Sequence, residues 1–407
     1  MVKVIIMIPS ALTERWQGMF CIDALASKFD LEYWDCSKIC EPAFESTTTL
    51  KRDYICTITN MEDMEVNLRR LPKDAVVISH IHLDGFNYEI HKLISKYIKT
   101  RVFVDFWANS IEAFVQNTTK KNTKIDKLIG YVKHLLWHSG AVYYLVRFLR
   151  AIRNRRLSDV RSAIDDRKNA KRFLHAKKLY NNIDITVLPH QRFSINHPDY
   201  EKYLDINSQE EKPIIEGDYI VFLDQYFPMH PTLKSENPDI DFGSLREPYY
   251  KSLISFFEKI EKEYGCPVVI AGHPIAKYDT NPFGNRPIVY FKTAELVHES
   301  RYVVLHNSYS ISFVLLFNKP FCMITNNAHQ FSSVSRKKNV LFGKSFKRDL
   351  VNVDLLKDVH KLFALADHDV REKYIESFFD TTVKEKNAEL LARHIEAIHC
   401  GIVESQL

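Results

Sequence analysis

The feature that most constrains the fold of this chain is a repeated alternation of short apolar runs with helical patterns. In the first half, runs rich in β-branched and aromatic residues alternate with segments whose apolar residues recur at helical spacing. The second half repeats the alternation more clearly. Because parallel strands joined by helices bury both faces of a sheet, the pattern predicts two α/β domains in succession. The length of 407 residues also exceeds that of one typical domain.

The expected strands are bounded by polar or turn-forming residues, and the expected helices lie between them. In the first half, strands are expected at residues 2–8, 31–34, 54–58, 75–80, 101–106 and 183–188, and helices at 16–28, 61–71 and 88–98. In the second half, strands are expected at residues 219–223, 267–271, 287–291, 302–306 and 320–325, and helices at 249–264, 293–299, 308–317, 353–366, 369–379 and 383–399.

A polar stretch at residues 207–217 reads as a linker between the two halves. We therefore expect an N-terminal α/β domain at residues 1–212 and a second α/β domain at 213–382. The remaining residues, 383–407, contain an amphipathic helix.

The basic charge is confined to one segment, from Lys120 to Lys178. This segment holds 17 Lys and Arg against 4 Asp and Glu, whereas the rest of the chain holds 39 against 47. Aromatic residues accompany the cations, so a basic helical insertion at about residues 120–180 suits an anionic membrane surface. Charged residues interrupt its apolar run too often for it to span a bilayer, and a solvated basic face is the alternative interpretation. No nucleic-acid-binding module accompanies the segment, so we expect no nucleic acid partner.

The cysteines and the N-terminal residues indicate the compartment. Seven cysteines, an odd number, follow no secreted disulfide pattern, which favours a reducing environment. The apolar residues 1–9 lack a small-residue cleavage site and read as a first strand rather than a signal peptide. We expect a cytoplasmic protein.

Several familiar signatures are absent from the sequence. It has no G-x-G-x-x-G, and Gly343-Lys344-Ser345 is not a P-loop because Lys338 stands where the first glycine should be. It also lacks H-E-x-x-H, C-x-x-C and G-x-S-x-G, which argues against a zinc protease, a thioredoxin-like enzyme and a serine hydrolase. We expect no metal.

Two loops of the second half carry residues suited to phosphate. His273 comes directly after a buried strand, where a histidine can bond a phosphate oxygen and stabilise a departing phosphate. A second loop leads from the strand expected at residues 302–306 into an apolar helix, and it contains Asn307, Ser308 and Ser310. Hydroxyls and backbone N–H groups at a helix start suit an anion. A structural histidine and a plain N-cap serine are the alternatives.

Asp224 ends the first strand of the second half, followed by Gln225. A carboxylate at a strand end can cap the next turn, or it can act as a nucleophile or charge stabiliser at an oxocarbenium-like centre. Weaker candidates near this site are His230, Lys277, Thr293 and Glu295.

Taken in order, four motifs in this half resemble a known family. Phe-Leu-Asp-Gln, Gly-His-Pro, Thr-Ala-Glu-Leu and His-Asn-Ser-Tyr-Ser…Asn-Lys-Pro, within residues 219–325, are similar to bacterial surface-polysaccharide glycosyltransferases of the GT-B type. The resemblance is to enzymes that use CMP-activated acidic sugars, such as β-Kdo transferases and sialyltransferases. It implies that His273, with Ser308 and Ser310, holds the CMP phosphate, and that Lys277 pairs with a sugar carboxylate. The nucleophile role of Asp224 extends this resemblance from its strand-end position and would give a retaining reaction.

The resemblance further implies two Rossmann-like domains facing across a cleft, with a terminal helix crossing back to the first domain. The expected activity is transfer of Kdo or a sialic-acid-like sugar to a lipopolysaccharide, O-antigen or capsule glycan, without a cofactor. Asp105, His80 and His82 are candidates for the acceptor side, although the histidines also suit strand capping. A lipid-linked glycan acceptor would place the enzyme at the inner leaflet of the bacterial inner membrane.

Two other functions remain open. A CDP-glycerol or CDP-ribitol phosphotransferase of cell-surface polymer synthesis is similar in having a His-Pro motif and a pair of serines. A non-catalytic sugar-binding protein would need neither Asp224 nor His273 for its function.

Overall fold

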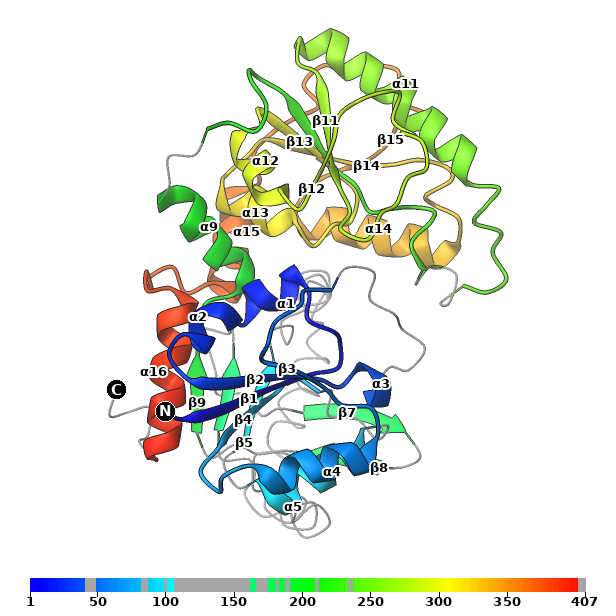
Figure 1. Cartoon of the computed structure of the whole chain (residues 1–407). Coiled ribbons are helices and arrows are strands. Elements are labelled where there is room, and N and C mark those ends of the chain that lie inside the picture. The colour runs from blue at the N-terminus through cyan, green and yellow to red at the C-terminus, as the bar shows by residue number, and fades with distance from the viewer. Residues whose placement is uncertain are drawn as a thin grey trace, which may run out of the picture. The chain divides into compact units, whose positions relative to one another are not determined.

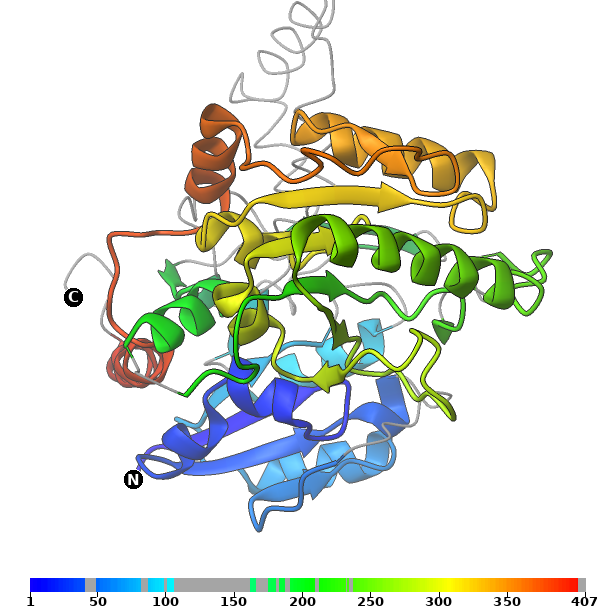
Figure 2. The same cartoon turned by 90° about the horizontal axis from the view of Figure 1, so that it is seen from above.

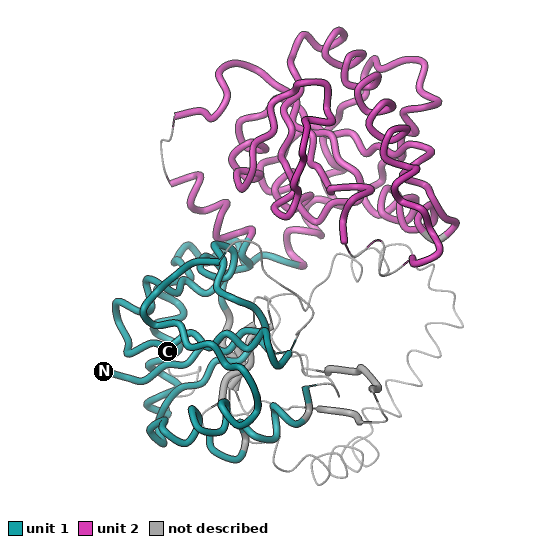
Figure 3. Tube along the Cα trace, turned by 45° about the vertical axis from the view of Figure 1, so that its right-hand side comes forward, with its two compact units in different colours: residues 1–108, 121–198, 378–407 teal, residues 109–120, 199–377 magenta. Residues whose placement is uncertain are grey.

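The computed structural model describes residues 1–40, 49–81, 87–98, 101–105, 162–165, 175–180, 183–186, 191–208, 212–231, 233 and 237–401. Within these residues the chain forms two compact units (Figure 3). Unit 1 contains the chain up to residue 198 and again from residue 378, and unit 2 contains residues 199–377. The divisions thus fall at 198–199 and 377–378, rather than at the expected 212–213 and 382–383.

Unit 1 is built on a parallel sheet of order β3-β2-β1-β4-β5-β6-β9 (Figure 1). Its strands are β1 (Lys3–Ile8), β2 (Asp30–Asp35), β3 (Ile55–Thr57), β4 (Val76–Ser79), β5 (Arg101–Asp105), β6 (Ser162–Asp165) and β9 (Gln191–Ser194). A separate antiparallel pair consists of β7 (His175–Tyr180) and β8 (Ile183–Thr186). The helices of this unit are α1 (Glu14–Met19), α2 (Ile22–Ala26), α3 (Ser37–Cys40), α4 (Met61–Arg70), α5 (Tyr88–Tyr97) and α16 (Asn387–Cys400).

Alternating residues of β1 enter two different cores, because successive side chains point to opposite faces of a sheet. Val4 and Ile6 pack in a core that includes Leu391 and Ile395 of α16. Ile5 and Met7 pack in a second core with residues of α4 and α5. The terminal helix α16, red in Figure 1, therefore covers the unit 1 sheet beside α2, as expected from the sequence.

Unit 2 contains a second parallel sheet, of order β12-β11-β10-β13-β14-β15. Its strands are β10 (Ile220–Leu223), β11 (Val268–Gly272), β12 (Ile288–Tyr290), β13 (Tyr302–Leu305), β14 (Phe321–Thr325) and β15 (Leu350–Asn352). The helices are α9 (Pro198–Ser208), α11 (Arg246–Tyr264), α12 (Thr293–Glu299), α13 (Ile311–Leu316), α14 (Ser333–Ser345) and α15 (His368–Phe378). The long helix α11 lies along one face of this sheet (Figure 2) and buries Leu253 and Phe257 against it.

Two parallel, helix-covered sheets, with the last helix returning to the first unit, confirm the α/β class and the GT-B-like chain topology. The strands are buried on both faces, so their near-continuous apolar runs are what a parallel sheet requires. Within the described residues, no helix combines the length and apolar character needed to cross a bilayer. All seven cysteines are free thiols.

Three expectations for local structure were wrong. The region expected as a basic helical insertion contains the strands β6 and β7, and most of its other residues lie outside the described ones. The expected helix at 16–28 is divided into α1 and α2 at Cys21, whose φ is 48°. Residues 353–366 form no helix, because Ala364 pairs with Phe321 of β14 and the Tyr264 hydroxyl bonds this segment at Val359 and Leu362.

Candidate functional site

The candidate site lies at the carboxyl edge of the unit 2 sheet. The central strands β11, β10 and β13 are neighbours in parallel register, with Leu223 opposite both Ala271 and Leu305. Their carboxyl ends therefore meet at one edge, which is where open α/β sheets bind ligands. The loops that leave these ends begin with Asp224, His273 and His306, which precedes Asn307, so the fold brings together the three loops singled out from the sequence.

Asp224 joins two of these loops. One carboxylate oxygen, Oδ1, accepts a hydrogen bond from the Tyr226 backbone N–H at 2.9 Å. The other, Oδ2, accepts from the His273 N–H at 3.2 Å and from the Tyr278 hydroxyl at 2.8 Å. The residue is only 6% exposed, and burial raises the pKa of its carboxyl group. These contacts support the capping interpretation, since both oxygens already hold the surrounding loops in place.

His273 lies half-exposed beside a second histidine. The Ile275 N–H donates to His273 Nδ1 at 3.4 Å, so a neutral ring carries its proton on Nε2. The His230 ring lies edge-on to it, with 5.1 Å between ring centroids. The loop after β10 thus supplies a second imidazole to the site.

The β13 loop contributes an amide and two hydroxyls. The Gln225 side-chain amide donates to Asn307 Oδ1 at 3.2 Å, which links this loop to the β10 loop. Ser308 Oγ accepts from the Ser310 N–H at 3.2 Å and so caps the start of α13. Ser310, the N-cap residue of α13, makes no side-chain capping bond. Both serines are half-exposed, so their hydroxyls border solvent at the site edge.

Beneath the site, two buried histidines support the loops, and sequence reasoning did not single them out. His306 Nδ1 lies 2.8 Å from the Ile324 carbonyl oxygen, which can only accept, so Nδ1 carries the proton. Its Nε2 then accepts from the Tyr249 hydroxyl at 2.9 Å. Burial lowers the pKa of His306 to about 4. The ring of His329 stacks on that of His306 with 4.1 Å between centroids, and burial lowers its pKa as well.

Three large apolar side chains of unit 2 are exposed in the loops after β11, β12 and β13. They are Ile275, Phe291 and Tyr309, exposed by 41%, 56% and 51%. They add exposed apolar surface to loops that otherwise carry polar groups.

The remaining candidates divide between this edge and other places. Lys277 is exposed, and its carbonyl accepts from the Tyr226 hydroxyl at 3.1 Å, which holds it in the β11 loop. Thr293 is the first residue of α12 and not its N-cap, which is Lys292. Glu295 is buried in ion pairs with Lys202 at 2.9 Å and Lys292 at 3.0 Å, an arrangement that fastens α9 to α12.

The acceptor-side candidates lie in unit 1. His82 is outside the described residues, and Asp105 is the last residue of β5. His80 is buried after β4, with its ring packed against Trp16 and Phe20. His80 thus occupies a packing position.

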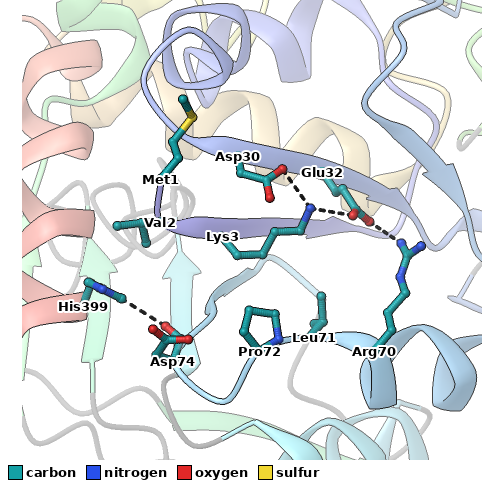
Figure 4. A pocket seen from close by; sticks show the side chains of 10 residues that line it. All are labelled: Met1, Val2, Lys3, Asp30, Glu32, Arg70, Leu71, Pro72, Asp74 and His399. Carbon is teal, nitrogen blue, oxygen red and sulfur yellow. Dashed lines mark hydrogen bonds and ion pairs between the residues drawn. The ribbon is translucent and has the colours of Figure 1, made fainter.

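A cavity of about 630 Å³ lies in unit 1 (Figure 4). It sits at the amino ends of β1 and β2, the edge opposite to the one where α/β sheets bind ligands. Glu32 accepts from both Lys3 at 2.7 Å and Arg70 at 2.5 Å, so the cations that line it are already paired. Among the described residues, no group of three or more His, Cys, Asp or Glu side chains could hold a metal ion.

No protein-family profile and no curated protein sequence matches this chain. Solved structures similar to it include the spinosyn forosaminyltransferase SpnP, at 12% identity and a TM-score of 0.36, covering 97% of this chain and 95% of that one. The glycosyltransferase SnogD from Streptomyces nogalater is similar at 11% identity and a TM-score of 0.38, covering 98% and 99%. The UDP-GlcNAc 2-epimerase of Methanocaldococcus jannaschii is similar at 12% identity and a TM-score of 0.42, covering 97% and 99%. These similar structures include transferases as well as an epimerase, so the similarity assigns no activity to this chain.

Proposed function

We propose that this chain is a glycosyltransferase whose donor, a CMP-activated acidic sugar, binds at the carboxyl edge of the unit 2 sheet. The observation that carries the proposal is the convergence of His273, Gln225 and the Asn307–Ser310 segment on that edge. Imidazole, amide and hydroxyl groups beside strand ends are suited to a nucleotide phosphate. The acceptor would be a glycan or lipid-linked glycan of the bacterial surface.

In this proposal His273 donates from Nε2 to a phosphate oxygen of the donor. An acceptor hydroxyl oxygen forms a bond to the anomeric carbon, and the bond from that carbon to the phosphate oxygen breaks. CMP leaves with the electrons of the broken bond, so negative charge grows on its phosphate, and the proton of the acceptor hydroxyl passes to solvent. The proton on His273 and the hydroxyls of Ser308 and Ser310 stabilise that charge. Lys277, exposed in the same loop as His273, offers an ammonium group to the sugar carboxylate. Phe291 and Tyr309 offer aromatic faces on which the base or sugar can stack.

Asp224 is assigned a positioning role in this proposal. A covalent nucleophile needs an oxygen that the anomeric carbon can approach, whereas Asp224 is 6% exposed and accepts three hydrogen bonds. Replacing Asp224 with Ala would leave the Tyr226 N–H, the His273 N–H and the Tyr278 hydroxyl without their acceptor. We expect this variant to lose thermal stability together with nucleotide binding, because unsatisfied buried donors cost about 1–3 kcal/mol each.

Thermal shift with CMP, UDP, GDP and ADP tests the proposal. A ligand at about 100 times its dissociation constant adds about 2.7 kcal/mol of stability, which a melting curve resolves. We expect CMP alone to stabilise the wild type and to have no effect on His273→Ala. The matched control is His368→Ala, which changes a histidine with a side chain 85% exposed in α15. Stabilisation by UDP instead would refute the CMP assignment, and no response to any nucleotide would favour the non-catalytic interpretation.

A phosphotransferase acting on CDP-glycerol or CDP-ribitol is the second candidate, and the His230–His273 pair favours it. Two imidazoles 5.1 Å apart can serve phosphoryl transfer without any carboxylate. Both reactions release CMP, so CMP binding does not separate them. The product does: glycosyl transfer adds no phosphorus to the acceptor, whereas phosphoryl transfer adds one new phosphodiester. Phosphorus NMR of the product from each donor class therefore distinguishes the two candidates.

A further inference from the structure

Helix α14 and the turn that follows it, up to residue 348, carry positive charge and no acidic residue. Between residues 336 and 348 the sequence has six Lys and Arg and no Asp or Glu. Lys347 pairs with Asp367 at 3.0 Å, and Arg348 is half-buried and donates to the Leu365 carbonyl. The side chains of Arg336, Lys337, Lys338 and Lys344 are exposed.

The position of these cations does not help the helix. Arg336, Lys337 and Lys338 lie in the first half of α14, and its first turn contains no acidic residue. The partial positive charge at a helix N-terminus disfavours cations there and favours carboxylates. The long helix α11 differs, since its cations alternate with acidic residues and Glu247 occupies its first turn. The charge of α14 therefore calls for an explanation other than helix stability.

The exposed cations surround an apolar strip. Arg336, Val340 and Lys344 follow one another at intervals of four residues, so they line one row along the helix. Lys337 and Leu341 form the adjacent row at the same spacing. Val340 is 37% exposed and Leu341 is half-exposed, while the opposite side buries Phe342 and Phe346. The exposed side of α14 thus combines cations with aliphatic side chains.

We propose that this α14 basic face (Arg336, Lys337, Val340, Leu341 and Lys344) binds the surface of an anionic lipid bilayer. A bilayer interface attracts the cations through its anionic headgroups and also accepts aliphatic side chains between them. A soluble polyanion uses only the charges and gains nothing from Val340. At 3.6 residues per turn, Arg336, Lys337 and Lys344 lie within about 100° of one another around the axis of α14, so these three cations can meet one flat surface together. This inference does not depend on the donor or on the reaction proposed above.

The test is co-sedimentation of the full chain with vesicles of phosphatidylcholine alone or of phosphatidylcholine with phosphatidylglycerol. The variant changes Arg336, Lys337 and Lys344 together to Gln. The matched control changes Arg246, Lys251 and Lys262 of α11 to Gln, which removes the same number of Arg and Lys residues from another helix of unit 2. Melting temperatures of both variants establish that they are folded.

We expect binding to the anionic vesicles only, lost at high salt and lowered in the α14 variant by a factor on the order of 100, since each cation near an anionic surface contributes about 1 kcal/mol. The α11 variant is expected to bind nearly as the wild type does. Equal loss in both variants would overturn the proposal in favour of a net-charge effect. An α14 variant that binds vesicles as the wild type does would also overturn the proposal. So would a wild-type protein that does not bind vesicles but binds a soluble polyanion such as heparin. Replacing Arg147, Arg150, Arg153, Arg155 and Arg156 with Gln tests the basic segment separately, and release by that variant alone would also contradict the α14 assignment.

Discussion

Acidification is expected to destabilise unit 2 through the buried imidazole of His306. Folding lowers the pKa of this group from 6.5 to about 4, because the ring is buried. The hydrogen bond from Nδ1 to the Ile324 carbonyl raises the pKa and offsets only part of the effect of burial. The unfolded chain takes up a proton below pH 6.5, whereas the folded one resists until about pH 4. The stability contributed by neutral His306 is therefore full above pH 6.5 and is lost as the pH falls toward 4.

The magnitude follows from these two pKa values. Between pH 7 and pH 5, proton linkage to this one group removes about 2 kcal/mol from the free energy of unfolding. His329 stacks on His306, and burial lowers its pKa too, so it acts in the same direction. Asp224 acts oppositely, because its raised pKa lets the folded state accept a proton more readily as the pH falls. A comparison of the wild type with a His306 variant isolates the His306 contribution from both.

The assay is urea unfolding of the wild type and His306→Gln at pH 7 and pH 5. Among the described residues the tryptophans are Trp16 and Trp34, both in unit 1, so their emission follows unit 1, while circular dichroism follows both units. We expect the pH-dependent loss in unit 2 to be smaller by about 2 kcal/mol in His306→Gln than in the wild type. The control substitution His368→Gln, at an exposed histidine, should leave this pH-dependent loss unchanged. An identical pH dependence in the wild type and His306→Gln would refute the reasoning.

Two further substitutions test the packing of each unit. In Gly272→Ala, the added Cβ would lie 2.7 Å from the Tyr290 ring, so we expect thermal melting to show a loss of about 1–3 kcal/mol, whereas Gly18→Ala, with no atom within 4 Å, should be neutral or stabilising. Asn387 and Asn196 exchange hydrogen bonds of 2.8 and 2.9 Å in the core of unit 1. Asn387→Ala should lower the free energy of unfolding, followed by tryptophan emission in urea, by about 1–3 kcal/mol for each unsatisfied group, and an unchanged unfolding curve would contradict this role.

The order of strands and helices was largely predictable from the sequence, because both sheets are parallel and buried. Apolar runs such as Val268–Gly272 predict buried strands from the local sequence alone. Breaks caused by individual backbone angles were not predictable. Cys21 adopts a left-handed φ of 48° inside a helical pattern, and no glycine or proline marks the position. The segment 353–366 has helical spacing but gains more from pairing with β14 than from a helix of its own.

The candidate site was predictable in its location but less so in its internal contacts. Strand ends on a parallel sheet converge, which is why Asp224, His273 and Ser308 could be grouped from order alone. The direction of the Asp224 carboxylate could not be predicted, because its partner Tyr278 lies 54 residues away in another loop. His306 was visible as the first residue of the His-Asn-Ser-Tyr-Ser motif, but its supporting role depends on the His329 ring, which only the fold brings near.

Hydrogen–deuterium exchange with and without CMP locates the donor site most directly. At a CMP concentration that saturates the thermal shift, the account predicts slower amide exchange in the three loops at residues 224–230, 272–278 and 306–311. The same protection should disappear in His273→Ala. Protection confined to the unit 1 cavity around Lys3 and Arg70, with none in the three loops, would contradict the assignment of the unit 2 edge as the nucleotide site.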